Sequence, residues 1–457
     1  VVLLVIYMIW RMLFLRLADA DPNRPVFFDS LVSMPLQALL DLSQKVLQDF
    51  VYLVTAWLVA VRPADIDLQR PFSLAAVGIV ILTVILFGLL LSRYQPMVEE
   101  RREDRWHIQA MILGTLAILL GTLPVWMIDR QVSVGSLGSR FSLAALFGVS
   151  MLLVGFLEWL SPRRQAKLTV ICLLIGVAVH ANLHTAKAYQ QSWEKQRSFY
   201  WQLFWRAPHV QPGTAFISNE EIFSYVGLYS TSMGISLLYP PVEQPEEMPY
   251  WFFAYWERLY KFPDQLVEGT LLEEGLRNHS FRGESTDAIL LDFSPELNRC
   301  LHLLSLREET DRDLPESIRG LLGISNLSRI SREPVDQWKP PASIFGPEPE
   351  HTWCYYYAKA ELAYQYEDWE EVVRVMKQAK DEGFAPTEMK EYLPLLHAYL
   401  NTGEAERART LSLQMARLSN NIDDRVCEAW LDASGANVDP EFSAAFEDIR
   451  DKSGCFD

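Results

Sequence analysis

Two acidic residues, Asp65 and Asp67, are the first candidates for chemistry. They are separated by one residue in the short polar loop 62–71 between apolar segments. Paired carboxylates can hold a divalent cation and, through it, a phosphate group. The pair therefore predicts a catalytic role at a membrane surface, with a divalent cation as cofactor. The plainer alternative is a solvated loop.

Two histidines form the second candidate site. His180 and His184 are four residues apart, a spacing that puts both imidazoles on one helix face. With a third ligand they could bind a metal ion, and the alternative is a pair of polar residues near the membrane interface. The sequence contains no glycine-rich phosphate loop and no GxSxG nucleophile motif, so it predicts no further cofactor site.

Six apolar segments in the first 188 residues must position these candidates. A bilayer core of about 30 Å needs about 20 apolar residues in a helix. We expect spans near residues 1–17, 45–61, 72–94, 106–127, 141–160 and 167–189. The second is amphipathic in its first half, and an interfacial helix is the alternative there. Because the sequence begins inside an apolar run with Val1, we expect it to be the C-terminal part of a longer protein.

Charges in the connecting loops predict the orientation. Cytoplasmic loops retain lysine and arginine. Basic residues gather between the third and fourth segments and again between the fifth and sixth: Arg93, Arg101, Arg102 and Arg105, then Arg163, Arg164 and Lys167. These loops are two spans apart, so they lie on the same side of the membrane. The sequence therefore predicts a multi-pass cell-membrane protein whose region after residue 189 is extracytoplasmic.

The region after the last apolar segment is strongly acidic. Residues 189–457 hold 45 acidic and 25 basic side chains, a net of −20, whereas residues 1–188 have a net charge of about +3. Nucleic-acid phosphates require clustered lysine and arginine, so a nucleic-acid partner is excluded. The expected partners are therefore the lipid bilayer and another protein.

Four parts are expected along the chain: a transmembrane bundle at 1–189, an α/β domain at 190–328, a Pro-rich linker at 329–350 and a helical domain at 351–457. Aromatic residues at 191–206 predict a belt at the membrane interface. Within the α/β domain, apolar runs predict strands at 213–218 and 288–293, and helical patterns fall at 220–228 and 250–260.

The C-terminal domain has the pattern of repeated helix pairs. Helices are expected at 352–366, 369–382, 388–401 and 404–419, and the two pairs are offset by about 36 residues. The segment AELAYQYEDWEEVVRVMKQAKDEGFAP resembles a tetratricopeptide repeat through Ala360, Trp369, Ala379 and Pro386. The next unit is similar through Tyr399, Gly403 and Ala408, although Lys359, Val372 and Leu396 depart from the family pattern. The resemblance implies a stacked helical array that binds proteins.

The overall layout loosely resembles the C-terminal part of membrane glycosyltransferases of the C-type superfamily. Those enzymes place an acidic residue in an early external loop, use lipid-phosphate sugar donors and often end in an external soluble domain. The resemblance implies that Asp65 and Asp67 act on a metal or donor. Two functions therefore stay open, a membrane-anchored protein for interaction or assembly and a glycosyltransferase with a lipid-linked donor, and the sequence does not decide whether the protein is an enzyme.

Four cysteines in the region after residue 189 are candidates for disulfides. Cys300, Cys354, Cys427 and Cys455 allow three pairings, which the sequence cannot rank. An extracytoplasmic compartment would permit such bonds. Cys172 lies inside an apolar segment and is expected to pack there.

Overall fold

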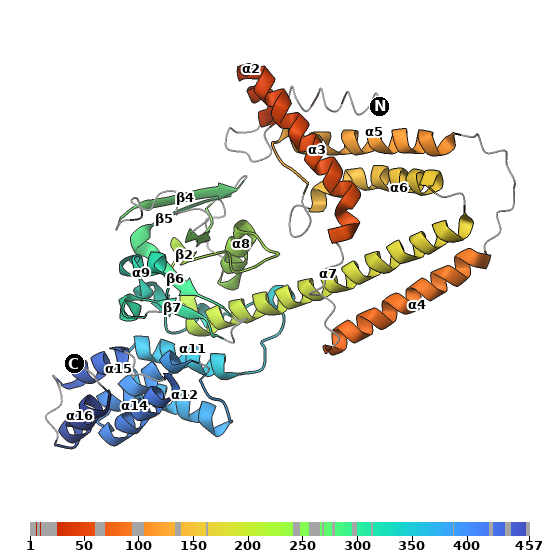
Figure 1. Ribbon diagram of the computed structural model, residues 1–457. Helices are drawn as coiled ribbons and strands as arrows, with labels where there is room; N and C mark the ends of the chain where they lie inside the picture. Colours follow the sequence, from red (N-terminus) through yellow and green to blue (C-terminus); the bar gives the residue numbers. More distant parts are fainter. Residues whose placement is uncertain are drawn as a thin grey trace. The chain divides into compact units, whose positions relative to one another are not determined.

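The computed structural model describes residues 6, 10, 25–59, 69–93, 105–132, 139–160, 163–240, 247–255, 266, 269–276, 279–294, 299–311, 314–386, 388–419, 424–434 and 440–453. The chain divides into two compact units, Val1–Gln190 and Gln191–Asp457. Each unit is described by itself (Figure 1).

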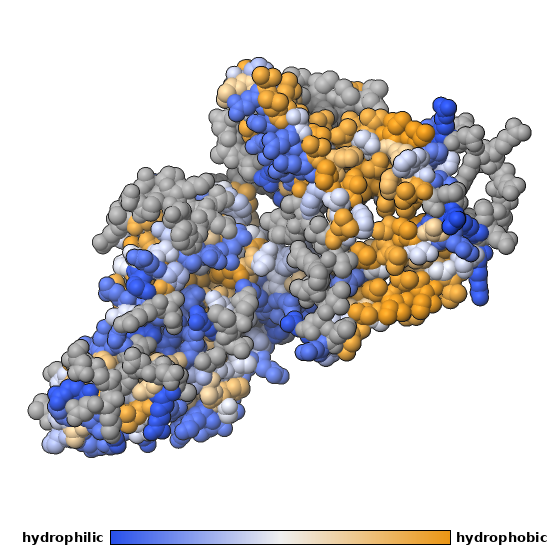
Figure 2. All heavy atoms as spheres, in the orientation of Figure 1, coloured by the Kyte–Doolittle hydropathy of each residue, from blue (hydrophilic) through white to orange (hydrophobic). Residues whose placement is uncertain are grey.

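The described part of the first unit is helical. Its elements are α2 (Val26–Ser33), α3 (Pro35–Val59), α4 (Pro71–Arg93), α5 (Trp106–Met127), the 3-10 helix η2 (Ser139–Ala145), α6 (Leu146–Leu160) and the first part of α7 (Arg164–Arg206). Within the described residues, four helices are long and apolar enough to cross a membrane: α4, α5, the continuous η2–α6 and α7. Figure 2 shows hydrophobic side chains over α4, α5 and α6. The protein is therefore a membrane protein.

Two of the six expected spans stay predictions. The segment near 1–17 lies almost wholly outside the described residues. The segment near 45–61 belongs to α3, which is not among the four apolar helices. Polar side chains of α3 contact the end of α5 and the residues after it. Asp49 accepts hydrogen bonds from the Trp126 indole at 2.7 Å and the Val132 amide at 3.1 Å, and Lys45 pairs with Asp129.

Glycines allow α5 and α6 to pack closely. A Cβ atom on Gly148 would lie 2.6 Å from the carbonyl oxygen of Gly114, and one on Gly114 would lie 2.7 Å from the carbonyl oxygen of Gly148. A backbone atom cannot swing away as the end of a flexible side chain can. Small residues at helix contacts are the usual way in which membrane helices approach each other.

The second unit contains the end of α7, a mixed α/β region and a run of helices. Its strands are β1 (His209–Val210), β2 (Thr214–Ser218), β3 (Tyr250–Ala254), β4 (Leu271–Leu276), β5 (His279–Glu284), β6 (Ala288–Asp292), β7 (His302–Leu304) and β8 (Ile330–Ser331). Its α-helices before the helical region are α8 (Leu228–Leu238), α9 (Glu316–Arg319) and α10 (Ala342–Phe345), with 3-10 helices η5 (Ser285–Asp287), η7 (Leu306–Glu308), η8 (Leu322–Ile324), η9 (Leu327–Arg329) and η10 (Val335–Gln337).

A four-stranded sheet in the order β3-β2-β6-β7 forms the centre of the α/β region. The first three strands are parallel, and β7 runs antiparallel to β6. Strand side chains alternate between two cores, with Phe216 and Phe252 on one face and Ile217 and Phe253 on the other. Burial on both faces explains why these strands are continuous apolar runs.

The strands expected near 213–218 and 288–293 are present as β2 and β6, but the two helical predictions between them were wrong. Tyr250–Ala254 is the fully buried strand β3, because its run of aromatic side chains packs into both cores at once. The helix of this region begins at Leu228, where the prediction for 220–228 ended.

The expected aromatic belt is largely core. In the part of α7 that belongs to the second unit, the buried aromatic residues are Phe199, Tyr200, Trp201 and Trp205. Trp193 is 44% exposed. These aromatic side chains therefore hold the end of α7 inside the unit instead of facing lipid.

The helical region comprises α11 (Trp353–Gln365), α12 (Trp369–Asp381), η11 (Met389–Tyr392), α13 (Leu393–Asn401), α14 (Ala405–Ser419), α15 (Asp424–Ser434) and α16 (Pro440–Ser453). Each odd-numbered helix packs against the helix that follows it, and α13 also contacts both α11 and α15. The three odd-numbered helices therefore lie side by side. All four helices expected at 352–419 are present, with η11 opening the third.

Segment 329–350, expected as a linker, is packed within the second unit. Phe345 is buried, and its carbonyl accepts from the Trp201 indole at 3.3 Å. The Pro347 carbonyl accepts from Arg197 at 2.7 Å, and Glu348 accepts from the Trp205 indole at 3.0 Å. These contacts bind the segment to α7.

Candidate functional site

A cavity of about 310 Å3 lies between the α/β region and the helical region of the second unit. The α/β region contributes β7, η7 and the turn at Asp311. The helical region contributes α11, the start of α12, η11, α13 and α15. The cavity is lined by His302, Leu304, Arg307, Glu308, Asp311, Tyr357, Glu361, Tyr364, Trp369, Lys390, Leu393, His397, Arg425, Glu428, Ala429 and Asp432.

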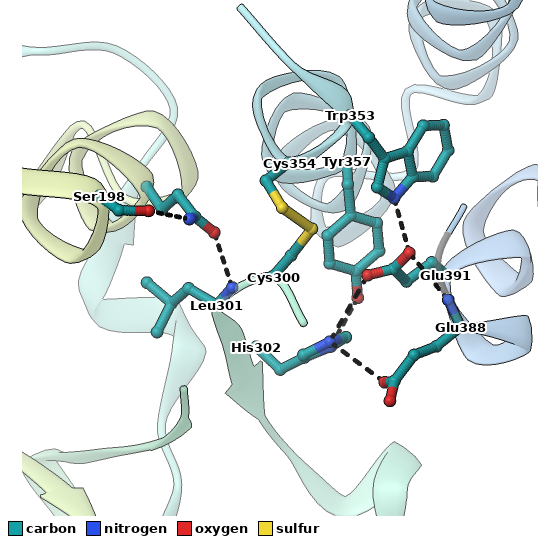
Figure 3. The surroundings of a disulfide bond; sticks show 10 residues. Ser198, Cys300, Leu301, His302, Trp353, Cys354, Tyr357, Glu388 and Glu391 are labelled. Atoms are coloured by element: carbon teal, nitrogen blue, oxygen red, sulfur yellow. Dashed lines mark hydrogen bonds and ion pairs between the residues drawn. A yellow bond between two sulfur atoms is a disulfide. The ribbon is translucent and has the colours of Figure 1, made fainter. Parts of the chain in front are cut away.

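A disulfide holds the two walls together. Cys300 and Cys354 are bonded, with their Cα atoms 5.2 Å apart. Cys300 stands two residues before His302 on β7, and Cys354 stands three residues before Tyr357 on α11 (Figure 3). The bond therefore fixes the strand and the helix that carry two of the lining side chains. Of the other candidate cysteines, Cys455 lies outside the described residues.

His302 is the most buried imidazole in the lining. Its Nδ1 lies 2.9 Å from the Tyr357 hydroxyl, which also donates to Glu361 at 3.3 Å. Its Nε2 has no hydrogen-bond partner among the described residues, and the nearest carboxylate oxygens, of Glu388 and Glu391, are 3.9 and 4.0 Å away. Burial and the nearby cations, Lys390 first, put the pKa of His302 well below its usual range, so the ring is neutral.

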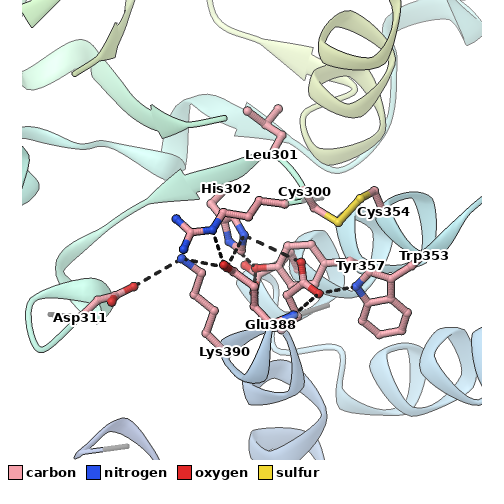
Figure 4. Close-up of polar contacts among 12 residues, drawn as sticks. Cys300, Leu301, His302, Asp311, Trp353, Cys354, Tyr357, Glu388 and Lys390 are labelled. Atoms are coloured by element: carbon pink, nitrogen blue, oxygen red, sulfur yellow. Dashed lines mark hydrogen bonds and ion pairs between the residues drawn. A yellow bond between two sulfur atoms is a disulfide. The ribbon is translucent and has the colours of Figure 1, made fainter. Parts of the chain in front are cut away.

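An ion-pair network closes the side of the cavity beside His302 (Figure 4). Asp311 accepts from Arg425 at 3.2 Å and faces Lys390 at 3.5 Å. Lys390 also faces Glu388 at 3.3 Å, and Glu388 pairs with Arg299. Asp311 is almost fully buried. A buried ion pair is stable only when close contacts and further hydrogen bonds offset the loss of water around its charges. The network joins the α/β region to η11 and α15.

Two glutamates face the cavity from opposite walls. Glu308 accepts from the Ser305 amide at 2.6 Å, yet burial and the charge of Glu361 raise its pKa to about 7. Burial also raises the pKa of Glu361, although Arg206 and Arg307 act against that shift. Carboxyl groups with raised pKa values are common at functional sites.

Aromatic rings form the wall between these glutamates and α13. The Arg307 guanidinium lies over the Tyr364 ring, whose centre is 5.7 Å from that of Trp369 and 5.1 Å from that of His397. Burial lowers the pKa of His397 to about 4, so this ring is also neutral. At the rim, Glu428 and Asp432 are exposed, one turn apart on α15.

The residues singled out from the sequence lie elsewhere. Asp65 and Asp67 fall outside the described residues. His180 and His184 do come together on α7, with ring centres 4.4 Å apart, and Phe72 lies edge-on to His184. Within the described residues, no group of three or more His, Cys, Asp or Glu side chains could hold a metal ion, so the pair has no third ligand there. His209, a further imidazole, is in β1 of the second unit.

The cavity residues left a faint signal in the sequence. Tyr357, Glu361 and Tyr364 recur at helical spacing on α11, so a half-buried acid lies on a face that otherwise packs apolar and aromatic groups. The signal gives no indication of the opposite wall, which comes from β7 and η7.

Comparison with known proteins gives no relative. No protein-family model, curated protein or solved structure matches this chain.

Proposed function

We propose that this integral membrane protein uses an acidic, extracytoplasmic helical-repeat region to bind or assemble a protein partner. The observation that carries the proposal is the cavity, because three side-by-side helices, α11, α13 and α15, line it together. Helical-repeat proteins use the surface built by equivalent helices of successive units for recognition. The tetratricopeptide-like pattern of 352–419 supports the same interpretation.

The lining supports recognition of a partner, because charges are matched across the walls, as for Asp311 with Lys390 and Arg425. The glycosyltransferase hypothesis depends on Asp65 and Asp67, and no described residue adds to it.

The extracytoplasmic assignment rests on two independent features. The basic loops before α5 and before α7 predict that the second unit is outside. The Cys300–Cys354 disulfide supports that side, because structural disulfides persist in oxidising compartments. Protease added to intact, right-side-out cells should therefore degrade the region after Gln190. Full protection of that region would overturn the orientation.

Photo-crosslinking tests the recognition role. A photoreactive amino acid placed at Asp432, on the cavity rim, should give a discrete protein adduct in intact cells. The matched control is the same group at Lys377, an exposed residue of α12 that does not line the cavity. Absence of an adduct at Asp432, or identical adducts at both positions, would count against a partner at this face.

A further inference from the structure

We propose that residues 35–50 of α3 lie in the membrane interface and that the groove between α3 and α5 binds the acyl chain of a phospholipid. The proposal concerns the first unit, so it goes beyond the function proposed for the second unit and does not depend on it. The lipid comes from the leaflet in which α5 ends. By the orientation that the basic loops predict, that leaflet is the outer one.

The polar side of α3 faces the end of α5. Lys45 pairs with Asp129, and Gln48 accepts a hydrogen bond from Gln131 at 2.8 Å. Asp41 is exposed one turn before Lys45, on the same side of the helix. Because α5 is among the helices that are apolar enough to cross a membrane, its end marks the membrane surface. The polar side of α3 therefore faces water at that surface.

The other side of α3 faces the middle of α5. A groove of about 460 Å3 lies there, lined by Thr115 of α5 and by residues of α3 that include Leu39, Val46 and Phe50. Thr115 lies twelve residues before Met127, the last residue of α5, which is about 18 Å along the helix axis. In Figure 1, α3 crosses α5 and α6 instead of running alongside them. A helix with one side toward water and the other toward the bilayer centre lies in the interface.

The lining of the groove suits a hydrocarbon chain. Its only polar side chains among the described residues are Ser43 and Thr115. The Ser43 hydroxyl donates to the Leu40 carbonyl at 2.7 Å, and the Thr115 hydroxyl donates to the Met111 carbonyl at 2.9 Å. The lining thus offers no charge and no remaining donor. A polar ligand would lose its water there without replacement, whereas an acyl chain has no hydrogen bonds to lose.

A second membrane helix is the alternative occupant, and the side chains around the groove disfavour it. Helices that meet within a bilayer approach through small residues, as α5 and α6 do at Gly114 and Gly148. The exposed side of α3 instead carries large residues, because Leu36, Leu40 and Leu47 are 74%, 60% and 65% exposed. These side chains keep another backbone away, while a flexible acyl chain can follow the surface between them.

Cysteine labelling in phospholipid nanodiscs tests the placement of α3. Cysteine at Gln37 or Asp41, on the polar side, should react with a water-soluble thiol reagent. Cysteine at Leu40 or Leu47 should react about tenfold more slowly, because a thiol in hydrocarbon stays protonated. Nanodiscs expose both faces of the bilayer, so the result is independent of orientation. Equal rates at all four positions would overturn the placement: if fast, α3 is in water, and if slow, it spans the membrane.

Photo-crosslinking identifies the occupant. A benzophenone side chain at Ser43, an exposed residue that lines the groove, should form an adduct with the acyl chain of a phospholipid in nanodiscs of phosphatidylethanolamine and phosphatidylglycerol. The same group at Gln37, on the polar side, is the control and should give little lipid adduct. A crosslinked dimer at Ser43 in place of the lipid adduct would show that a second copy of the chain covers the groove, and the lipid assignment would be wrong.

Lipid retention separates a bound lipid from the bulk bilayer. Native mass spectrometry of the full chain, released from the nanodiscs into mild detergent, should detect retained phospholipid. Ser43→Trp should reduce the retained amount by about tenfold, because the indole fills apolar space that the chain otherwise occupies. The matched control is Leu120→Trp on α5, at a residue that is 69% exposed and outside the groove, and it should retain lipid as the unaltered protein does. No retained lipid, or equal retention in the two variants, would refute the groove as a lipid site.

Discussion

The Trp126 indole nitrogen donates a hydrogen bond to the Asp49 carboxylate at 2.7 Å. The same oxygen accepts from the Val132 amide, and Asp49 is only 2% exposed. A single acid on α3 therefore satisfies two buried donors at the end of α5. Since α3 carries Lys45, Gln48 and Asp49 at helical spacing, this contact sets which face of α3 meets α5.

Replacing Asp49 tests that contact. Asp49→Ala leaves two buried N–H groups without an acceptor and should destabilise the first unit by about 2–5 kcal/mol. Asp49→Asn keeps one acceptor oxygen and should therefore reduce the stability of the first unit by less than Asp49→Ala does. Thermal unfolding of the full chain in detergent would measure both, with Asp41→Ala, an exposed acid of the same helix, as the control. Equal behaviour of Asp49→Ala and Asp41→Ala would contradict the assigned role.

Helix packing in the apolar unit is tested at Gly148. Gly148→Ala adds a Cβ that would lie 2.6 Å from the Gly114 carbonyl oxygen, so the two helices must separate. We expect the protein to lose about 1–3 kcal/mol of stability. Gly78→Ala on α4, where a Cβ meets nothing within 4 Å, is the control and should be neutral or stabilising. The midpoint of unfolding in a mixed-micelle titration measures the difference, and a stabilised Gly148→Ala protein would disprove close packing there.

The disulfide gives a prediction about both stability and compartment. Cys300 and Cys354 are 54 residues apart, and replacing both by serine should cost about 2–4 kcal/mol. Hydrogen exchange in peptides that cover β7 should accelerate in the double variant. Thiol labelling before and after reduction, in intact cells, checks whether the bond exists there. Free labelling of both Cys300 and Cys354 before reduction would place the second unit in a reducing compartment.

The raised pKa of Glu308 predicts how pH affects the cavity. A folded-state pKa of about 7, above the usual value for glutamate, means that the folded state binds this proton more tightly than the unfolded chain does. Its stabilising contribution is complete below the unfolded pKa and is lost as the pH rises through about 7. Hydrogen exchange of residues 299–311 should therefore quicken between pH 5 and pH 8, after correction for the intrinsic rate, and Glu308→Gln should flatten that change. Equal pH profiles for the two proteins would rule out titration at Glu308.

The spans at α4, α5, α6 and α7 could be predicted because the bilayer demands about 20 apolar residues in a row, and that demand is local in sequence. The strands β2 and β6 were similarly evident as short apolar runs. Strand β3 was mistaken for a helix, because YWFFAYW also fits helical spacing and only the burial of both of its faces, in the two cores, shows that it is a strand. Tertiary burial, which the sequence does not display, overrode the local pattern there.

The cavity itself could not be predicted from the sequence. His302, Glu361 and Asp432 are brought together by packing between segments more than fifty residues apart, and their individual residue types are ordinary. The candidates that the sequence did offer were chosen by short spacing. His180 and His184 lie together as expected, but no third metal ligand is present among the described residues. A catalytic role for Asp65 and Asp67 stays a hypothesis.

The position of α15 limits how this protein can change in evolution. Because α15 is both the third odd-numbered helix and the rim of the cavity, a duplicated or deleted helix pair would shift Arg425, Glu428 and Asp432 away from β7. Repeat arrays usually gain and lose units freely, since each unit contacts only its neighbours. Here α15 and β7 line the same cavity, so the number of helices before α15 is expected to stay constant while the residues at the rim vary.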